Sequence, residues 1–236
     1  MPETAAILAG GLATRLRGIA DDRPKCLVEV NGRAFLEYQL RHLRRHGFDR
    51  VVMLIGHRGE QVVDFLGDGS RLGVEVLYSR ESEPLGTAGA MKRAEALLNE
   101  PFLLLNGDTM AEVDLRALYA FHCTQPAALV TMALCEMDDA SNYGSVVVDA
   151  AGRVMGFQEK RPRRRPGLVN AGVYCFSPRV FSYIPAGRKA STETDLLPAL
   201  IEKGEPICGF CFRGVFVDIG TGDRLAQAQT HSLFRL

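Results

Sequence analysis

The first half of the chain alternates short apolar runs of strand length with segments in which apolar residues recur at helical spacing. The expected strands and helices follow one another as 5–9, 35–46, 51–55, 60–66, 74–78, 86–98, 102–105 and 115–122. Strands separated by helices become parallel neighbours joined by right-handed crossovers. The pattern therefore predicts an α/β fold, with a Rossmann-like, mostly parallel sheet covered by helices on both faces.

The second half is less regular and richer in short strands. The expected strands are 128–134, 145–148, 154–158, 169–176, 208–212 and 215–217. Helices are expected at 198–201, after an acidic stretch, and at 221–233. Because several strands follow one another without helices between them, we expect them to extend the sheet as a small antiparallel annex.

Composition excludes several classes of protein. The 236 residues carry 28 basic and 28 acidic side chains, so the formal net charge is zero and a nucleic-acid partner is not expected. No apolar run is long enough to span a membrane, and the first residues lack the features of a secretory signal, so we expect a cytoplasmic protein with no membrane partner. The Cys208-Gly209-Phe210-Cys211 sequence falls in an expected strand and is interpreted as structural rather than metal-binding.

The first expected strand ends in Gly10 and Gly11, where backbone can approach a ligand closely. The residues after it supply the Thr14 hydroxyl and the Arg15 guanidinium, and Lys25 follows a short distance later. Successive backbone N–H groups and fixed cations are suited to a polyphosphate. We therefore predict a nucleotide site at the carboxyl edge of the sheet.

Two other expected strands end in an aspartate. Asp108 follows the run 102–105, and Asp218 follows the run 215–217. Carboxylates at a sheet edge suit Mg²⁺, which takes its remaining ligands from phosphates and water. Capping of a nearby helix is the structural alternative for Asp108. With a phosphate-binding loop expected nearby, we predict a metal-binding role.

Together these segments resemble the sugar-1-phosphate nucleotidylyltransferases. The signature loop of that family is Gly-Gly-x-Gly-Thr-Arg-Leu followed by Pro-Lys, and the matching residues are Gly10, Gly11, Thr14, Arg15, Leu16, Pro24 and Lys25. Ala13 stands where the family usually has glycine, and Gly222 stands where it often has proline. The resemblance implies the nucleotide-diphospho-sugar transferase fold, in one domain over 1–236. Residues 1–125 would bind the nucleotide, and residues 126–236 the sugar phosphate.

The resemblance also implies a role for each matching residue, with Mg²⁺ as cofactor. Arg15 and Lys25 would be catalytic, and Asp108 and Asp218 would bind the metal. The nucleotide would contact Leu8, Gly10, Gly11, Thr14, Arg15, Glu83, Pro84, Gly86 and Thr87. The sugar phosphate would contact Asn106, Gly144, Glu159, Lys160 and Asn170. Strand alternation would place Glu159 and Lys160 on opposite faces unless the strand is irregular there.

Within the family, the motifs are most similar to those of the D-glycero-α-D-manno-heptose-1-phosphate guanylyltransferases. That similarity implies transfer from GTP to the heptose 1-phosphate, giving pyrophosphate and the GDP-heptose of bacterial capsule or lipopolysaccharide synthesis. Mannose-1-phosphate guanylyltransferases and sugar-1-phosphate uridylyl- and thymidylyltransferases share the same catalytic motifs and stay open as alternatives. A non-catalytic sugar-nucleotide sensor and a metal-dependent glycosyltransferase are less favoured. The sequence ends soon after its last expected helix, so we expect no left-handed β-helix domain and no trimer built on one; a homodimer stays open.

Overall fold

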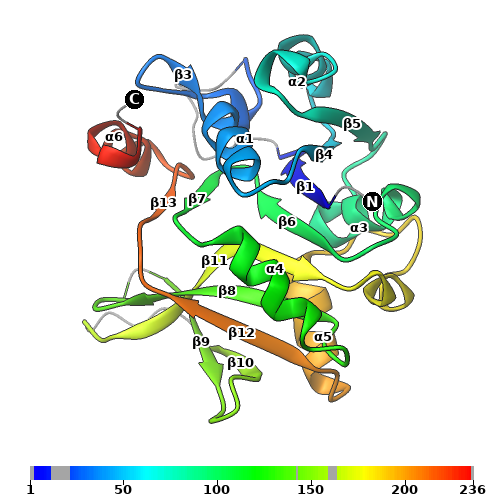
Figure 1. Cartoon of the computed structure of the whole chain (residues 1–236), viewed down its shortest axis with the longest axis vertical. Helices are drawn as coiled ribbons and strands as arrows, with labels where there is room; N and C mark the ends of the chain where they lie inside the picture. The colour runs from blue at the N-terminus through cyan, green and yellow to red at the C-terminus, as the bar shows by residue number, and fades with distance from the viewer. Residues whose placement is uncertain (1–2, 12–21, 142, 159–163, 235–236) are drawn as a thin grey trace.

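The computed structural model describes residues 3–11, 22–141, 143–158 and 164–234. Within this part of the chain, nine strands form one mixed sheet, which Figure 1 shows running through the whole molecule. The strand order is β10-β9-β11-β6-β1-β4-β5, with β8 beside β11 and β12 beside β8.

The centre of the sheet is parallel, as predicted. Strand β1 (Thr4–Ala9) lies between β6 (Phe102–Asn106) and β4 (Arg50–Ile55), and β5 (Glu75–Arg80) is at the edge beyond β4. The side chains of β1, β4 and β6 are mostly apolar and almost all buried, as is typical of parallel strands covered on both faces. Because the strands run the same way, their carboxyl ends meet at one edge of the sheet.

The predicted antiparallel annex is confirmed, with one parallel member. Strand β8 (Val130–Met137) and strand β9 (Ser145–Val148) both pair antiparallel with β11 (Gly167–Phe176), and β10 (Val154–Gln158) pairs antiparallel with β9. Strand β12 (Ile207–Phe212) pairs parallel with β8. The long β11 also pairs with β6, so the annex and the parallel sheet are continuous.

Helices cover both faces of the sheet. Helices α1 (Phe35–Arg45), α2 (Gly59–Leu66) and α4 (Leu115–Cys123) share one apolar core with Ala5, Ile7 and Ala9 of β1. Helices α3 (Gly86–Arg93) and α5 (Leu197–Glu202) pack on the opposite face against Ala6. Figure 1 shows α1 and α4 in front of the sheet and α5 behind it. No helix of the described residues is long and apolar enough to cross a membrane.

Two small two-stranded sheets were not predicted, although one of their strands corresponds to the strand expected at 215–217. Strand β7 (Thr109–Ala111) pairs with β13 (Phe216–Asp218), and β2 (Glu29–Val30) pairs with β3 (Arg33–Ala34). The other three strands, of two or three residues, are too short to show an alternating pattern. The same region contains the C-terminal helix α6 (Gly222–Thr230), which packs near α1 and β2 through a third apolar cluster.

Two predicted helices are shorter than expected. Helix α3 ends at Arg93 rather than Leu98, and a 3-10 turn (Glu95–Leu97) follows it, because the chain must tighten to enter β6 a few residues later. Helix α6 ends at Thr230, before a second 3-10 turn at Ser232–Phe234. Its start is as expected, since the Thr221 hydroxyl accepts a hydrogen bond from the Arg224 N–H.

The buried histidine of α4 should make stability depend on pH. His122 is 4% exposed, and burial lowers its pKa from 6.5 to about 4, so it stays neutral in the folded protein. In the unfolded chain His122 binds a proton near its ordinary pKa of 6.5. The contribution of His122 to the free energy of unfolding is therefore constant above pH 6.5 and falls as the pH decreases towards 4. His122→Gln should remove about 2 kcal/mol of the loss in unfolding free energy between about pH 7.5 and about pH 5.

Urea unfolding at the two pH values measures this effect. His57→Gln is the matched control, because His57 is exposed in the turn after β4. An equal loss of stability in wild type and His122→Gln between the two pH values would contradict the account.

Candidate active site

A cavity of about 440 Å³ opens at the edge where the parallel strands end. We call it the sheet-edge cavity. Of the residues predicted to bind ligand, it is lined by Leu8, Gly10, Gly11, Lys25, Pro84, Gly86, Thr87, Asn106 and Asp108. The described edge of the sheet therefore brings together residues from four separate segments of the sequence.

Other predicted residues lie elsewhere. Glu83 is exposed and outside the cavity lining, and Asn170 and Asp218 adjoin lining residues without being part of it. Gly144 is exposed directly before β9. The roles predicted for Thr14, Arg15, Glu159 and Lys160 concern residues outside the described part of the chain, as does the departure at Ala13.

Glycine at two positions allows the cavity walls to approach each other. A Cβ on Gly107 would collide with the Leu8 carbonyl oxygen, so only glycine lets the end of β6 lie against the end of β1. Gly86 has φ +71°, and a Cβ there would lie 2.5 Å from the Ala190 carbonyl oxygen. These contacts bring the α3 turn and the 188–193 segment together over the cavity.

A glutamate that the sequence analysis passed over lies at the end of the cavity formed by β1, β4 and α3. The Glu81 carboxylate follows β5 and accepts a hydrogen bond from the Leu85 N–H at 3.0 Å. Its other oxygen lies over Gly10 and Gly56, where a Cβ would come within 2.9 and 2.5 Å of it. The glutamate that lies against the cavity is therefore Glu81, whereas Glu83 is exposed.

The two aspartates predicted as metal ligands lie close together in the fold, Asp108 in the turn before β7 and Asp218 at the end of β13. Asp218 at the end of β13 is in register with Thr109, and the Ile219 N–H donates to the Asp108 carbonyl at 2.9 Å. Pairing of β7 with β13 is therefore what joins two residues more than a hundred positions apart. The pairing places the backbone at Asp218 beside the backbone at Asp108.

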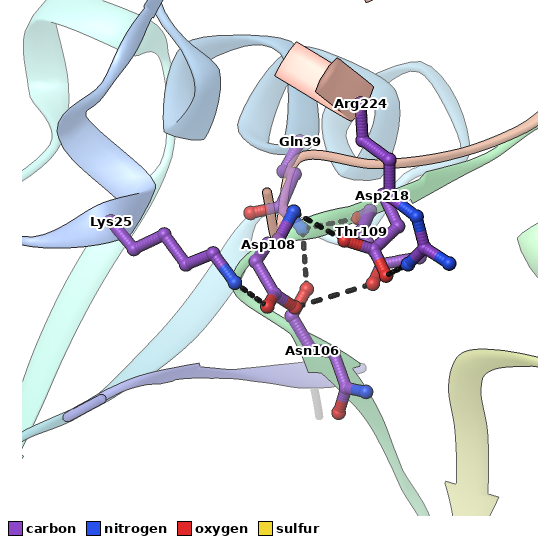
Figure 2. Close-up of polar contacts among 8 residues, drawn as sticks. Lys25, Gln39, Asn106, Asp108, Thr109, Asp218 and Arg224 are labelled. Atoms are coloured by element: carbon purple, nitrogen blue, oxygen red, sulfur yellow. Dashed lines mark hydrogen bonds and ion pairs between the residues drawn. The ribbon is translucent and has the colours of Figure 1, made fainter. Parts of the chain in front are cut away.

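Each of these aspartates contacts a cation (Figure 2). The Lys25 ammonium donates to Asp108 Oδ2 at 2.5 Å, and the Arg224 guanidinium donates to Asp218 Oδ2 at 2.5 Å. Asp218 also accepts from the Gly220 N–H, and a Cβ on Gly220 would lie 3.3 Å from the Lys25 nitrogen. Two carboxylates and two cations thus form one compact charged cluster beside the cavity.

The donor atoms of this cluster fit Mg²⁺. Mg²⁺ prefers hard oxygen ligands and is commonly bound by one or two carboxylates, with phosphate and water completing the shell. Asp108 and Asp218 offer that pair of carboxylates. Among the described residues, no group of three or more His, Cys, Asp or Glu side chains gathers to bind a metal.

A buried glutamine fixes the loop that carries Asp108. Gln39 of α1 is fully buried, and its amide nitrogen donates to the carbonyls of Asn106 and Thr109, both at 2.8 Å (Figure 2). Two carbonyl acceptors identify this atom as nitrogen rather than oxygen. The side chain therefore sets the path of the backbone on both sides of Asp108.

The far side of the cavity contains a hydrogen-bonded group from β11. The Asn170 amide donates to the Tyr174 hydroxyl at 2.7 Å and to Glu193 Oε1 at 3.2 Å, and the Tyr174 hydroxyl donates to the same oxygen at 3.1 Å. The register of β11 shifts here, and Gly172 within the shift has φ +65°. The irregular strand directs these side chains toward the cavity wall at Glu193.

Tyr143 connects the loop before β9 with the charged cluster. Its ring packs against Phe216 at 5.3 Å, and the Arg224 guanidinium lies 5.0 Å from its ring centre. Burial raises the pKa of the Tyr143 hydroxyl, with Arg224 opposing the shift. Gly144, predicted as a sugar-phosphate contact, is the next residue and is thereby placed on the same side of the molecule as Asp218.

The sequence analysis also missed several other residues of the site. Gln39 has no motif, because a buried polar side chain in an amphipathic helix carries no local signal. Lys189, Ser191, Thr192 and Glu193 line the cavity from a segment interpreted only as the approach to a helix. A polar stretch entering a helix is usually a cap, and Ser191 does cap this one by accepting from the Thr194 N–H.

Known proteins are similar to this chain in sequence and in fold. Residues 4–233 match the model of the nucleotidyl transferase family. The chain therefore belongs to that family.

Two relatives and one solved structure illustrate the similarity. The chain is 35% identical to the D-glycero-α-D-manno-heptose 1-phosphate guanylyltransferase of Aneurinibacillus thermoaerophilus, over 95% of this chain and 96% of that protein. It is 33% identical to the UTP–glucose-1-phosphate uridylyltransferase of Synechocystis sp., over 92% of this chain but only 60% of that protein. HddC from Yersinia pseudotuberculosis, solved in complex with GMP-PN, superimposes with a TM-score of 0.84 at 29% identity, over 96% of this chain and 98% of that one.

Replacing Gln39 should disturb both stability and the position of Asp108. Gln39→Met keeps the side-chain volume but leaves the carbonyls of Asn106 and Thr109 buried without a donor. We expect a loss of about 2–5 kcal/mol in the free energy of unfolding. Chemical denaturation measures it, with Gln227→Met on the exposed face of α6 as control. A loss no larger than that of the control would show that Gln39 does not fix the loop.

Proposed function

We propose that the chain transfers a nucleotidyl group from a nucleoside triphosphate to a sugar 1-phosphate. Membership of the nucleotidyl transferase family supports this reaction class. The observation that carries the proposal is the position of Lys25, Asp108 and Asp218 beside the sheet-edge cavity, where an anionic substrate would meet cations and metal-binding oxygens. The product would be a nucleoside-diphosphate sugar.

In this reaction a phosphate oxygen of the sugar 1-phosphate attacks the α-phosphorus of the triphosphate. The bond from that phosphorus to the bridging oxygen breaks, and pyrophosphate leaves with the bonding electrons. The attacking oxygen is already ionised, so the protein need not remove a proton. Alignment and neutralisation of charge would supply the rate enhancement.

The described residues divide this work between them. The Lys25 ammonium would exchange its contact with Asp108 for an α-phosphate oxygen, which neutralises charge at the reacting centre. Gly10 and Gly11 would let the triphosphate lie against backbone. From the sequence we assign Arg15 to the departing pyrophosphate and Lys160 to the incoming sugar phosphate.

Asp108 and Asp218 would bind Mg²⁺, which when bound supplies further neutralisation of the phosphate oxygens. Arg224 orients the Asp218 carboxylate through its contact at 2.5 Å. Tyr143, under that guanidinium, fixes its position. These two side chains therefore prepare one carboxylate of the pair.

Glu81 supports GTP as the nucleotide. Guanine presents two adjacent donors, its N1–H and its exocyclic amino group, and a carboxylate can accept from both at once. Uracil and thymine present a single N–H between two carbonyl oxygens, which a carboxylate would repel. The relatives that transfer guanylyl groups and the GMP-PN complex of HddC are consistent with this choice.

For the sugar we propose D-glycero-α-D-manno-heptose 1-phosphate, with mannose 1-phosphate as the second candidate. Guanylyltransferases named for the heptose 1-phosphate and guanylyltransferases named for mannose 1-phosphate are equally similar to this chain, at 33–35% identity. GDP-heptose made in the cytoplasm would then serve surface-polysaccharide synthesis.

Pyrophosphate release tests the proposed reaction. The purified protein is incubated with Mg²⁺, each of the four nucleoside triphosphates and dTTP, and each of heptose, mannose and glucose 1-phosphate. We expect the highest rate with GTP and heptose 1-phosphate, and loss of about a hundredfold or more in Asp108→Asn. Pyrophosphate release from no pair of substrates, or an Asp108→Asn variant as active as wild type, would contradict the proposal.

Two neighbouring glutamates test the choice of base. Glu81→Gln should lower kcat/KM for GTP by about tenfold or more relative to UTP, because the amide can accept only one of the two hydrogen bonds from guanine. Glu83→Gln is the matched control, since Glu83 is exposed and does not line the cavity. A larger decrease in Glu83→Gln than in Glu81→Gln would show that Glu83, and not Glu81, recognises the base.

A further inference from the structure

Glu193 is a cavity-lining carboxylate that no predicted motif includes. It lies in the turn Thr192–Leu196 that leads into α5, more than twenty residues after Asn170. We propose that Glu193 accepts hydrogen bonds from hydroxyl groups of the sugar ring and so contributes to selection of the sugar. This inference rests on the proposed function, because it assumes a sugar 1-phosphate in the sheet-edge cavity.

The hydrogen bonds of Glu193 fix one of its oxygens. Oε1 accepts from the Asn170 amide at 3.2 Å and from the Tyr174 hydroxyl at 3.1 Å. Tyr174 is 1% exposed, and burial together with the Glu193 charge raises its hydroxyl pKa well above the ordinary value, so it remains a donor. With Oε1 occupied by two donors from β11, the carboxylate is oriented and Oε2 remains for a ligand.

The chemistry of the surroundings favours a neutral donor. Within the described residues, no lysine, arginine or histidine lies within ion-pair distance of Glu193. An anionic oxygen without a cation repels a phosphate group and accepts well from a hydroxyl. Of the two proposed substrates, the sugar presents several hydroxyls in different directions, so its ring is the portion that suits this wall.

The backbone around Glu193 is attached to the nucleotide side of the cavity. The Thr192 N–H donates to the Thr87 hydroxyl at 2.6 Å, the Ala190 N–H donates to the Leu85 carbonyl at 2.8 Å, and the Ala190 carbonyl accepts from Ala88 at 2.9 Å. These bonds connect the 188–193 segment to the turn that begins α3. The distance from Glu193 to the nucleotide site is therefore set by main-chain contacts, as selection between similar sugars requires.

A purely structural role is the alternative, in which Glu193 only satisfies the Tyr174 hydroxyl. The two roles predict different changes in the KM values of the two substrates. Loss of a sugar contact raises the KM of the sugar phosphate alone, whereas a displaced β11 would alter stability and both substrates together. Glu193→Gln keeps the size of the side chain and an acceptor for Tyr174.

The experiment compares wild type, Glu193→Gln and the control Glu202→Gln, which alters an exposed acid on α5 outside the cavity. Calorimetric binding and KM are measured with mannose 1-phosphate and heptose 1-phosphate, and with analogues of each that lack one ring hydroxyl. We expect Glu193→Gln to weaken sugar-phosphate binding about tenfold with the GTP KM within twofold of wild type. Removing the hydroxyl that Glu193 contacts should cost wild type about tenfold and the variant little.

Equal affinity of wild type and Glu193→Gln for the sugar phosphates would overturn the inference. It would also be overturned if each analogue that lacks one hydroxyl lost the same affinity for both proteins. Binding of none of the sugar phosphates by wild type would overturn it as well. Failure of the proposed function is distinguishable, because it appears as absent pyrophosphate release by wild type, whereas failure of this inference appears in an active enzyme whose Glu193→Gln variant behaves as Glu202→Gln does.

Discussion

The short pairing of β7 with β13 is the constraint on which the site depends. It joins a strand from the middle of the chain to one near its end and sets Asp218 in register with Thr109. The Ile219 N–H bond to the Asp108 carbonyl at 2.9 Å continues the pairing past the last strand residue. Without it, the chain would have two separate aspartates, each with one cation, and no shared place for a metal ion and a phosphate.

Several buried contacts support this pairing from the parallel sheet. Gln39 fixes the backbone on both sides of Asp108, and Gly107 permits β6 to end against β1. Cys26, next to Lys25, is buried, and burial raises its pKa to about 12, so the thiol acts as an apolar anchor for that lysine. The charged cluster thus stands on rigid elements, which favours positioning of phosphates over flexible capture.

The sequence predicts the parallel sheet well because its signals are local. Apolar runs such as Phe102–Leu105 and the helical stripe of α1 have the lengths and periods expected of buried strands and amphipathic helices. The motifs at Gly10, Gly86 and Asp108 follow strands, so their meeting at one edge is predictable. By contrast, β7 is too short for a pattern, and no local signal pairs it with the strand expected at 215–217. Glu81 differs from Glu83 only in the direction that the turn gives its side chain. The position of Glu193 follows from bonds between Ala190 and α3 that no local sequence specifies.

The central claim is that Asp108 and Asp218 form one cation site together. Binding of Mn²⁺ in the presence of GTP, followed by electron paramagnetic resonance, tests it in wild type, Asp108→Asn, Asp218→Asn and the double variant. If the carboxylates share one ion, each single variant should weaken binding about tenfold or more, and the double variant should lose much less than the product of the two effects. Losses that multiply, or single variants that bind Mn²⁺ as wild type does, would contradict the account.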